Sequence, residues 1–118
     1  MLPGDNPKRM EIYMTDMPHI GGSIQCGYRP AIIVQNNAGN ESSSTVIVVP
    51  LTSRQKHWMP THVNIGMDTG IRKNSIALCE QIQTIPKAML VRKIGEITTP
   101  AYIEKIRRAI EVSLALSE

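Results

Sequence analysis

Short β-branched runs with only turn residues between them constrain the fold of this chain more than any other feature of its sequence. Six such runs, rich in Val, Ile and Thr and separated by Pro- and Gly-bearing segments, lie at residues 11–16, 30–35, 45–51, 61–65, 75–82 and 89–97. No helical segment lies between them to serve as the crossover that a parallel sheet requires. The pattern predicts a mainly β protein, an antiparallel barrel or sandwich, in the single domain that 118 residues can form.

Two of these runs and the segment between them carry more specific predictions. Residues 30–35 are apolar almost throughout, which indicates a strand buried on both faces. Residues 45–51 give the strongest strand signal, and Pro50 near their end favours an edge or a bulge there. Residues 36–44 are rich in turn formers and have no core side chain larger than Ala, so they are expected to form a surface loop.

The end of the chain changes from strand to helix periodicity. Thr99 and Pro100 supply an N-cap and a first-turn proline, and Ile103, Ile106, Ile110 and Leu114 then recur at helical spacing. This predicts an amphipathic helix over residues 100–116. Residues 1–9 lack any periodic pattern, so we expect a flexible leader there and one domain over residues 10–118.

Composition and motif searches exclude several classes of function. Thirteen Lys and Arg against ten Asp and Glu give a net charge of +3, which is compatible with a polyanionic ligand but weaker than in a dedicated charge-driven binder. No apolar run resembles a signal peptide or approaches a membrane span, which favours a soluble cytoplasmic protein with two reduced cysteines, Cys26 and Cys79. No phosphate-loop or dinucleotide motif is present, and His57 and His62 are not spaced as metal ligands, so neither a cofactor nor a metal is expected.

Polar residues gather beside two of the predicted strands. Ser23, Gln25 and Arg29 precede the run at 30–35, and Thr52 and Ser53 follow the run at 45–51. Hydroxyls and a guanidinium on loops held by rigid strands suit a phosphodiester, because both its ground state and its transition state are anionic. Spacing alone favours the simpler interpretation, in which these are ordinary turn residues. A nucleophilic pair of Cys26 with a histidine is a further alternative that spacing does not support.

Four segments in a fixed order resemble the MazF/PemK family of toxin endoribonucleases. They are Gly22-Ser23-x-Gln25-x-Gly27-Tyr28-Arg29-Pro30-Ala31-x-x-Val34-Gln35-Asn36, then Ser44-Thr45-Val46-Ile47-Val48-Val49-Pro50-Leu51-Thr52-Ser53, then Pro60-Thr61-His62-Val63, and Glu80-Gln81-Ile82-x-Thr84-Ile85 before the closing helix. The resemblance implies an SH3-like antiparallel β-barrel of the MazF/CcdB type with a C-terminal helix. It also implies a homodimer with a small acidic MazE-like antitoxin as partner.

The resemblance further implies metal-independent cleavage of single-stranded RNA at a short sequence. The ribose 2′-hydroxyl would attack the phosphate, leaving a 2′,3′-cyclic phosphate and a 5′-hydroxyl. Arg29 and Thr52 match the family's catalytic residues, and Ser23, Gln25, Ser53 and Gln81 are expected to bind substrate.

The sequence departs from the family pattern at two places. Met10-Glu11 replaces the usual Gly-Asp pair, and Ile24 replaces an acidic residue of the Gly-rich loop, which removes a candidate carboxylate base. A weakened nuclease or a noncatalytic binding module therefore stays open as an alternative, because a fold by itself implies no activity. A gyrase-inhibitor-like toxin acting by protein contact is another.

Overall fold

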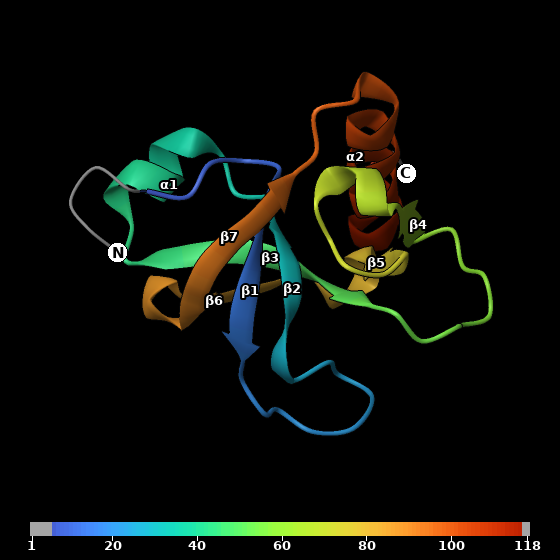
Figure 1. Ribbon diagram of the computed structural model, residues 1–118, viewed down its shortest axis with the longest axis horizontal. Coiled ribbons are helices and arrows are strands. Elements are labelled where there is room, and N and C mark those ends of the chain that lie inside the picture. Colours follow the sequence, from blue (N-terminus) through green and yellow to red (C-terminus); the bar gives the residue numbers. More distant parts are fainter. Residues whose placement is uncertain (1–5, 117–118) are drawn as a thin grey trace.

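A computed structural model describes residues 6–116 of the chain, which form an antiparallel seven-stranded sheet with one long helix at its end (Figure 1). The strands are β1 (Glu11–Met17), β2 (Gly27–Ile33), β3 (Thr45–Thr52), β4 (His62–Ile65), β5 (Ser75–Leu78), β6 (Gln83–Pro86) and β7 (Leu90–Glu96). Their order is β4-β5-β3-β2-β1-β7, with β6 also paired to β3. Helix α2 spans Pro100–Leu114, helix α1 spans Asn37–Ser42, and three 3-10 turns lie at Met67–Thr69 (η1), Cys79–Gln81 (η2) and Lys87–Met89 (η3).

The predicted fold class, mainly β with a C-terminal helix, is confirmed. The sheet curls in the manner of a barrel but does not close, since the end strands β4 and β7 are not paired with each other in the described part of the chain. No helix within residues 6–116 is long and apolar enough to cross a membrane.

Side-chain alternation gives the sheet a hydrophobic cluster on each face. Along β2, Ile32 belongs to one cluster while Ala31 and Ile33 belong to the other, as predicted for a strand buried on both faces. Helix α2 covers the first cluster with Ile106 and Ala109, both buried. The strand itself begins three residues earlier than the sequence indicated, at Gly27.

Strand β3 changes its hydrogen-bonding partner near Pro50. On one side it pairs with β2, where Ala31 faces Pro50; on the other it pairs with β6 as far as Val48 and with β5 from Leu51. The Ile47 carbonyl accepts from Val34 and points toward β2, so by alternation the proline nitrogen points to the other side, where no residue is paired with it. Pro50 is thus in a central strand and not at an edge. Its nitrogen points to the side where β3 has no partner at this position, so the sheet loses no hydrogen bond.

Two other sequence predictions are corrected by the structure. Residues 37–42 form helix α1 instead of a loop, because the Asn36 side chain accepts a hydrogen bond from the Gly39 N–H at 2.8 Å and caps the helix. The single strand expected over 75–82 is divided into β5 and the turn η2.

The predicted leader lies partly outside the described residues, which begin at residue 6. Pro7 is buried, the Arg9 N–H donates to the Asn37 side chain at 2.8 Å, and the Arg9 guanidinium donates to the Val34 carbonyl. Residues 6–9 are therefore attached to the sheet and to α1.

Two glycines let the η1 segment lie directly against β7. A Cβ on Gly95 would stand 1.9 Å from the Thr69 carbonyl oxygen, and one on Gly70, whose φ is +109°, would stand 2.5 Å from the Ile94 carbonyl oxygen. Only residues without a side chain allow this approach.

Candidate active site

Arg29 and Thr52 lie on the same face of neighbouring strands. The β2–β3 pairing ends at Ala31 and Pro50, and its register, continued by two residues, sets Arg29 opposite Thr52. Pro30 follows Arg29 in β2 and faces Leu51 in β3. A proline has no N–H, so it cannot donate to the Leu51 carbonyl. The Arg29 guanidinium reaches that carbonyl instead, with Nη1 3.4 Å from the oxygen.

A second contact ties Arg29 to the loop before its strand. Its Nε donates to the Cys26 carbonyl at 2.8 Å, which leaves Nη2 without a hydrogen bond to any described residue. Thr52 is 4% exposed, and its hydroxyl oxygen accepts from the Arg54 N–H at 3.2 Å, so the hydroxyl hydrogen is available. Two donors on one face therefore remain free for an anion.

The Gly-rich loop, residues 18–26, is fixed in place by Gln81. The Gln81 Oε1 accepts from the Gln25 N–H at 2.8 Å, and its Nε2 donates to the Ser23 carbonyl at 3.1 Å. Both functional groups of the amide are thus used on the loop backbone. Gly21 and Gly22 adopt φ values of +124° and +59°, which allow the loop to turn toward η2.

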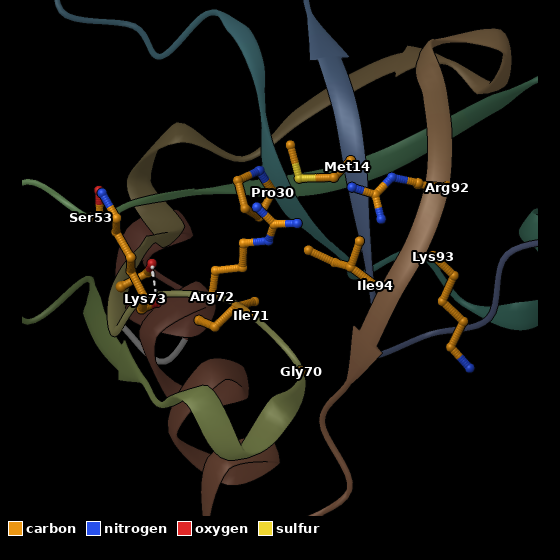
Figure 2. A pocket seen from close by; sticks show the side chains of 11 residues that line it. Met14, Pro30, Ser53, Gly70, Ile71, Arg72, Lys73, Arg92, Lys93 and Ile94 are labelled. Atoms are coloured by element: carbon orange, nitrogen blue, oxygen red, sulfur yellow. Dashed lines mark hydrogen bonds between the residues drawn. The ribbon is translucent and has the colours of Figure 1, made fainter.

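The structure brings together two sets of the predicted site residues and separates one residue from them. Ser23, Gln25 and Gln81 are joined directly, and the Cys26 carbonyl connects their loop to the Arg29–Thr52 pair. Ser53 instead lines a separate cleft, formed by β1, β2, β7 and residues 70–75 (Figure 2). Ile24 is 38% exposed and offers no group that could exchange a proton.

The two carbonyl acceptors of Arg29, from Cys26 and Leu51, were not anticipated from the sequence. Every residue has a backbone carbonyl, so residue identity does not show which carbonyl accepts a hydrogen bond. One of the two acceptors had a sequence signal. Once the register sets Pro30 opposite Leu51, the missing proline N–H indicates that the Leu51 carbonyl needs another donor.

A polar cluster lies next to Gln81 along the chain. His62 Nε2 is 2.9 Å from a carboxylate oxygen of Glu80, whose other oxygen accepts from the Thr61 hydroxyl at 3.0 Å. In residues 6–116 no three His, Cys, Asp or Glu side chains group as metal ligands. Beside Glu80, burial together with that carboxylate's charge raises the pKa of the Cys79 thiol to about 12, so this thiol stays protonated and inert.

The antiparallel sheet with its terminal helix defines a class of small proteins that share this fold. The solved MazF of Deinococcus radiodurans superposes with a TM-score of 0.81 over 93% of this chain and 97% of that one, at 19% identity, which shows the common fold. The family model described as PemK-like, MazF-like toxin of type II toxin-antitoxin system matches residues 8–114. The chain belongs to this family.

Relatives with higher sequence identity extend the comparison. Endoribonuclease EndoA of Bacillus subtilis is 40% identical over 111 residues, which cover 92% of this chain and 95% of that protein. Endoribonuclease MazF of Staphylococcus saprophyticus is 38% identical over 111 residues, covering 92% of each. A mycobacterial endoribonuclease solved in complex with its cognate antitoxin has a TM-score of 0.78 and 31% identity, covering 93% of this chain and 96% of that one.

Proposed function

We propose that this protein is a toxin endoribonuclease that cleaves single-stranded RNA at the Arg29–Thr52 pair. Its relatives at 38% and 40% identity are named endoribonucleases, which supports the activity. The observation that carries the assignment of the site is the pair of free donors on one sheet face, the Arg29 Nη2 and the Thr52 hydroxyl. Such donors stabilise a phosphate whose negative charge grows in the transition state.

The proposed reaction is an internal transfer at phosphorus. The 2′-oxygen forms a bond to phosphorus as its proton leaves, the bond from phosphorus to the 5′-oxygen breaks, and that oxygen takes a proton. The products are a 2′,3′-cyclic phosphate and a 5′-hydroxyl. Arg29 and Thr52 hold the non-bridging oxygens, and Arg29 is a poor general base because guanidinium keeps its proton. With Ile24 in the loop, electrostatic stabilisation carries most of the rate enhancement.

The proposed substrate-binding residues act in two ways. Ser23, Gln25 and Ser53 would contact the RNA. Gln81 would act through the loop, since both groups of its amide are already bonded to the loop backbone.

The proposal extends to the cell and to partners. The antitoxin-bound mycobacterial relative supports a cognate antitoxin as the inhibitor of this chain. We place the protein in the cytoplasm, where messenger RNA is the available substrate, and as a homodimer, which gives two small sheets one longer binding surface.

The test is cleavage of mixed RNA in EDTA, followed by end-group analysis. The wild type should generate new 5′-hydroxyl ends, and Arg29→Ala should lose at least about a hundredfold in rate while melting near the wild-type temperature. Arg29→Lys should not restore full activity, since an ammonium lacks the planar fork of donors. Arg108→Ala, on the exposed side of α2, is the matched control. Cleavage by Arg29→Ala at more than a tenth of the wild-type rate would overturn the assignment, and RNA binding without new ends would indicate a noncatalytic module.

A further inference from the structure

A basic cleft opens on the face of the sheet opposite the proposed catalytic pair, at the same end of β2. It has a volume of about 450 Å³ and is formed by β1, β2, β7 and residues 70–75. Pro30, the residue after Arg29, and Ser53, the residue after Thr52, both line it. Because side chains alternate along β2, Pro30 shares the face of Ile32 and Arg29 shares the face of Ala31. The cleft and the pair therefore lie on opposite faces of the sheet, at neighbouring positions of β2.

Two arginine side chains enter the cleft, and their guanidiniums are available to bind a ligand. Figure 2 shows the Arg72 and Arg92 side chains extending from opposite walls toward Pro30 and Met14. Both are exposed, and neither makes a hydrogen bond or an ion pair with any residue in the described part of the chain. Lys93 differs, because it points away in the same view and its ammonium lies 2.9 Å from a carboxylate oxygen of Glu11.

The rest of the lining is apolar. Met14, Pro30, Ile71 and Ile94 form a floor between the two guanidiniums. A site with an apolar floor and a few convergent cations suits a ligand that has a flat apolar part and an anionic part. Arginine binds phosphate through two parallel N–H donors and also stacks on planar rings.

We infer that this cleft is a nucleotide subsite of the RNA-binding surface, with Arg72 and Arg92 on a phosphate of an RNA strand that passes over the end of β2, and the base on the apolar floor. The inference rests on the proposed function. Single-stranded RNA is recognised through splayed bases that stack on arginine or apolar side chains, which is what this lining provides. An acidic protein segment is the competing occupant. It would use the guanidiniums but has no planar group for the floor.

The experiment combines cleavage kinetics with binding of a fluorescent 2′-O-methyl RNA of mixed sequence, which lacks the nucleophile. Arg72→Gln and Arg92→Gln should each raise KM and the RNA Kd about tenfold, with kcat unchanged. Each should also lower the slope of log Kd against log salt by about 1, since each removes one phosphate contact. Met14→Ser should raise Kd without changing that slope. Arg108→Gln, with the same charge change on α2, should alter neither quantity.

The results separate this inference from the proposed function. A wild type that cleaves RNA while Arg72→Gln and Arg92→Gln match it in KM, Kd and salt slope would overturn the subsite and leave the endoribonuclease intact. A wild type that neither binds nor cleaves RNA would overturn both. If the two variants lose affinity for polyglutamate but not for RNA, the cleft takes an acidic segment and the nucleotide assignment is wrong.

Discussion

At the scale of single residues, the candidate site depends on a hydrogen bond that a proline cannot make. Pro30 leaves the Leu51 carbonyl without its partner in β2, and Arg29 takes that place. The missing proline N–H, at the point where the β2–β3 pairing ends, therefore also orients the Arg29 side chain that would hold the phosphate.

Thr52→Val tests the other member of the pair. The substitution keeps the shape and removes the hydroxyl, so we expect kcat to fall about a hundredfold while KM changes by less than about threefold. Single-turnover cleavage measures the first quantity, and binding of 2′-O-methyl RNA checks the second. Thr84→Val, at an exposed position of β6, is the control. A collapse of binding with an unchanged single-turnover rate would assign Thr52 to recognition.

Cys79 gives a prediction about pH. Burial raises the pKa of its thiol from 9.0 to about 12, so the folded state resists losing a proton that the unfolded state gives up near pH 9. The contribution of this group to stability is full below pH 9 and declines as pH rises toward 12. Urea unfolding at pH 8, 9.5 and 11 should show a smaller alkaline loss for Cys79→Ala than for the wild type. Equal losses in the two proteins would contradict the prediction.

The residues of the site were predictable to different degrees. Arg29 and Thr52 could be named because two separate motifs carry them, and the structure sets them on facing strands. The separation of Ser53 from them could not be predicted, because the side to which a residue points just after a strand depends on where the strand ends. The basic cleft could not be predicted, because Arg72 and Arg92 come together only where residues 69–70 lie against β7.

At the scale of elements, the loop before β2 depends on one amide for its position. Gln81→Ala removes its hydrogen bonds to the Gln25 N–H and the Ser23 carbonyl. We expect the Gln25 amide to exchange at least about tenfold faster with solvent and kcat/KM to fall severalfold, with little change in melting temperature. Gln81→Glu keeps the acceptor and loses the donor. Its exchange rate at Gln25 and its kcat/KM should therefore lie between those of the wild type and of Gln81→Ala.

The control for this prediction is Gln55→Ala, at an exposed position outside the loop. Slower cleavage by Gln81→Ala with an unchanged exchange rate at Gln25 would mean that Gln81 contacts RNA itself.

Most strands were predictable from alternation, and the two errors have separate causes. The run at 75–82 is apolar and β-branched, yet η2 interrupts it. Before η2 the chain pairs with β4 and with the end of β3, and after it β6 pairs with the first half of β3, a shift that composition does not encode. Helix α1 was hidden because Asn, Gly and Ser are turn formers, while a single well-placed cap, Asn36, is sufficient to start one helical turn. Local propensity gave way to strand pairing at η2 and to one capping side chain at α1.

At the scale of the whole molecule, we predict a homodimer that a cognate acidic antitoxin inhibits by competing with RNA. Sedimentation at micromolar concentration should give twice the mass of the 118-residue chain. The net charge of +3 should make the antitoxin bind more tightly at low salt, and saturating antitoxin should release bound RNA. A monomer would contradict the first part. Inhibited cleavage with RNA still bound at full affinity would contradict the second.

The contact between Gly70 and Gly95 has a consequence for how the basic cleft would work. Arg72 follows the first glycine by two residues and Arg92 precedes the second by three, so the two walls are joined where backbone meets backbone. Walls joined in this way do not swing independently, and the cleft is preorganised. The cleft would then lose little conformational entropy when a ligand binds. Binding should follow one-step kinetics without a slow isomerisation. Selectivity would be set by the geometry of the free protein.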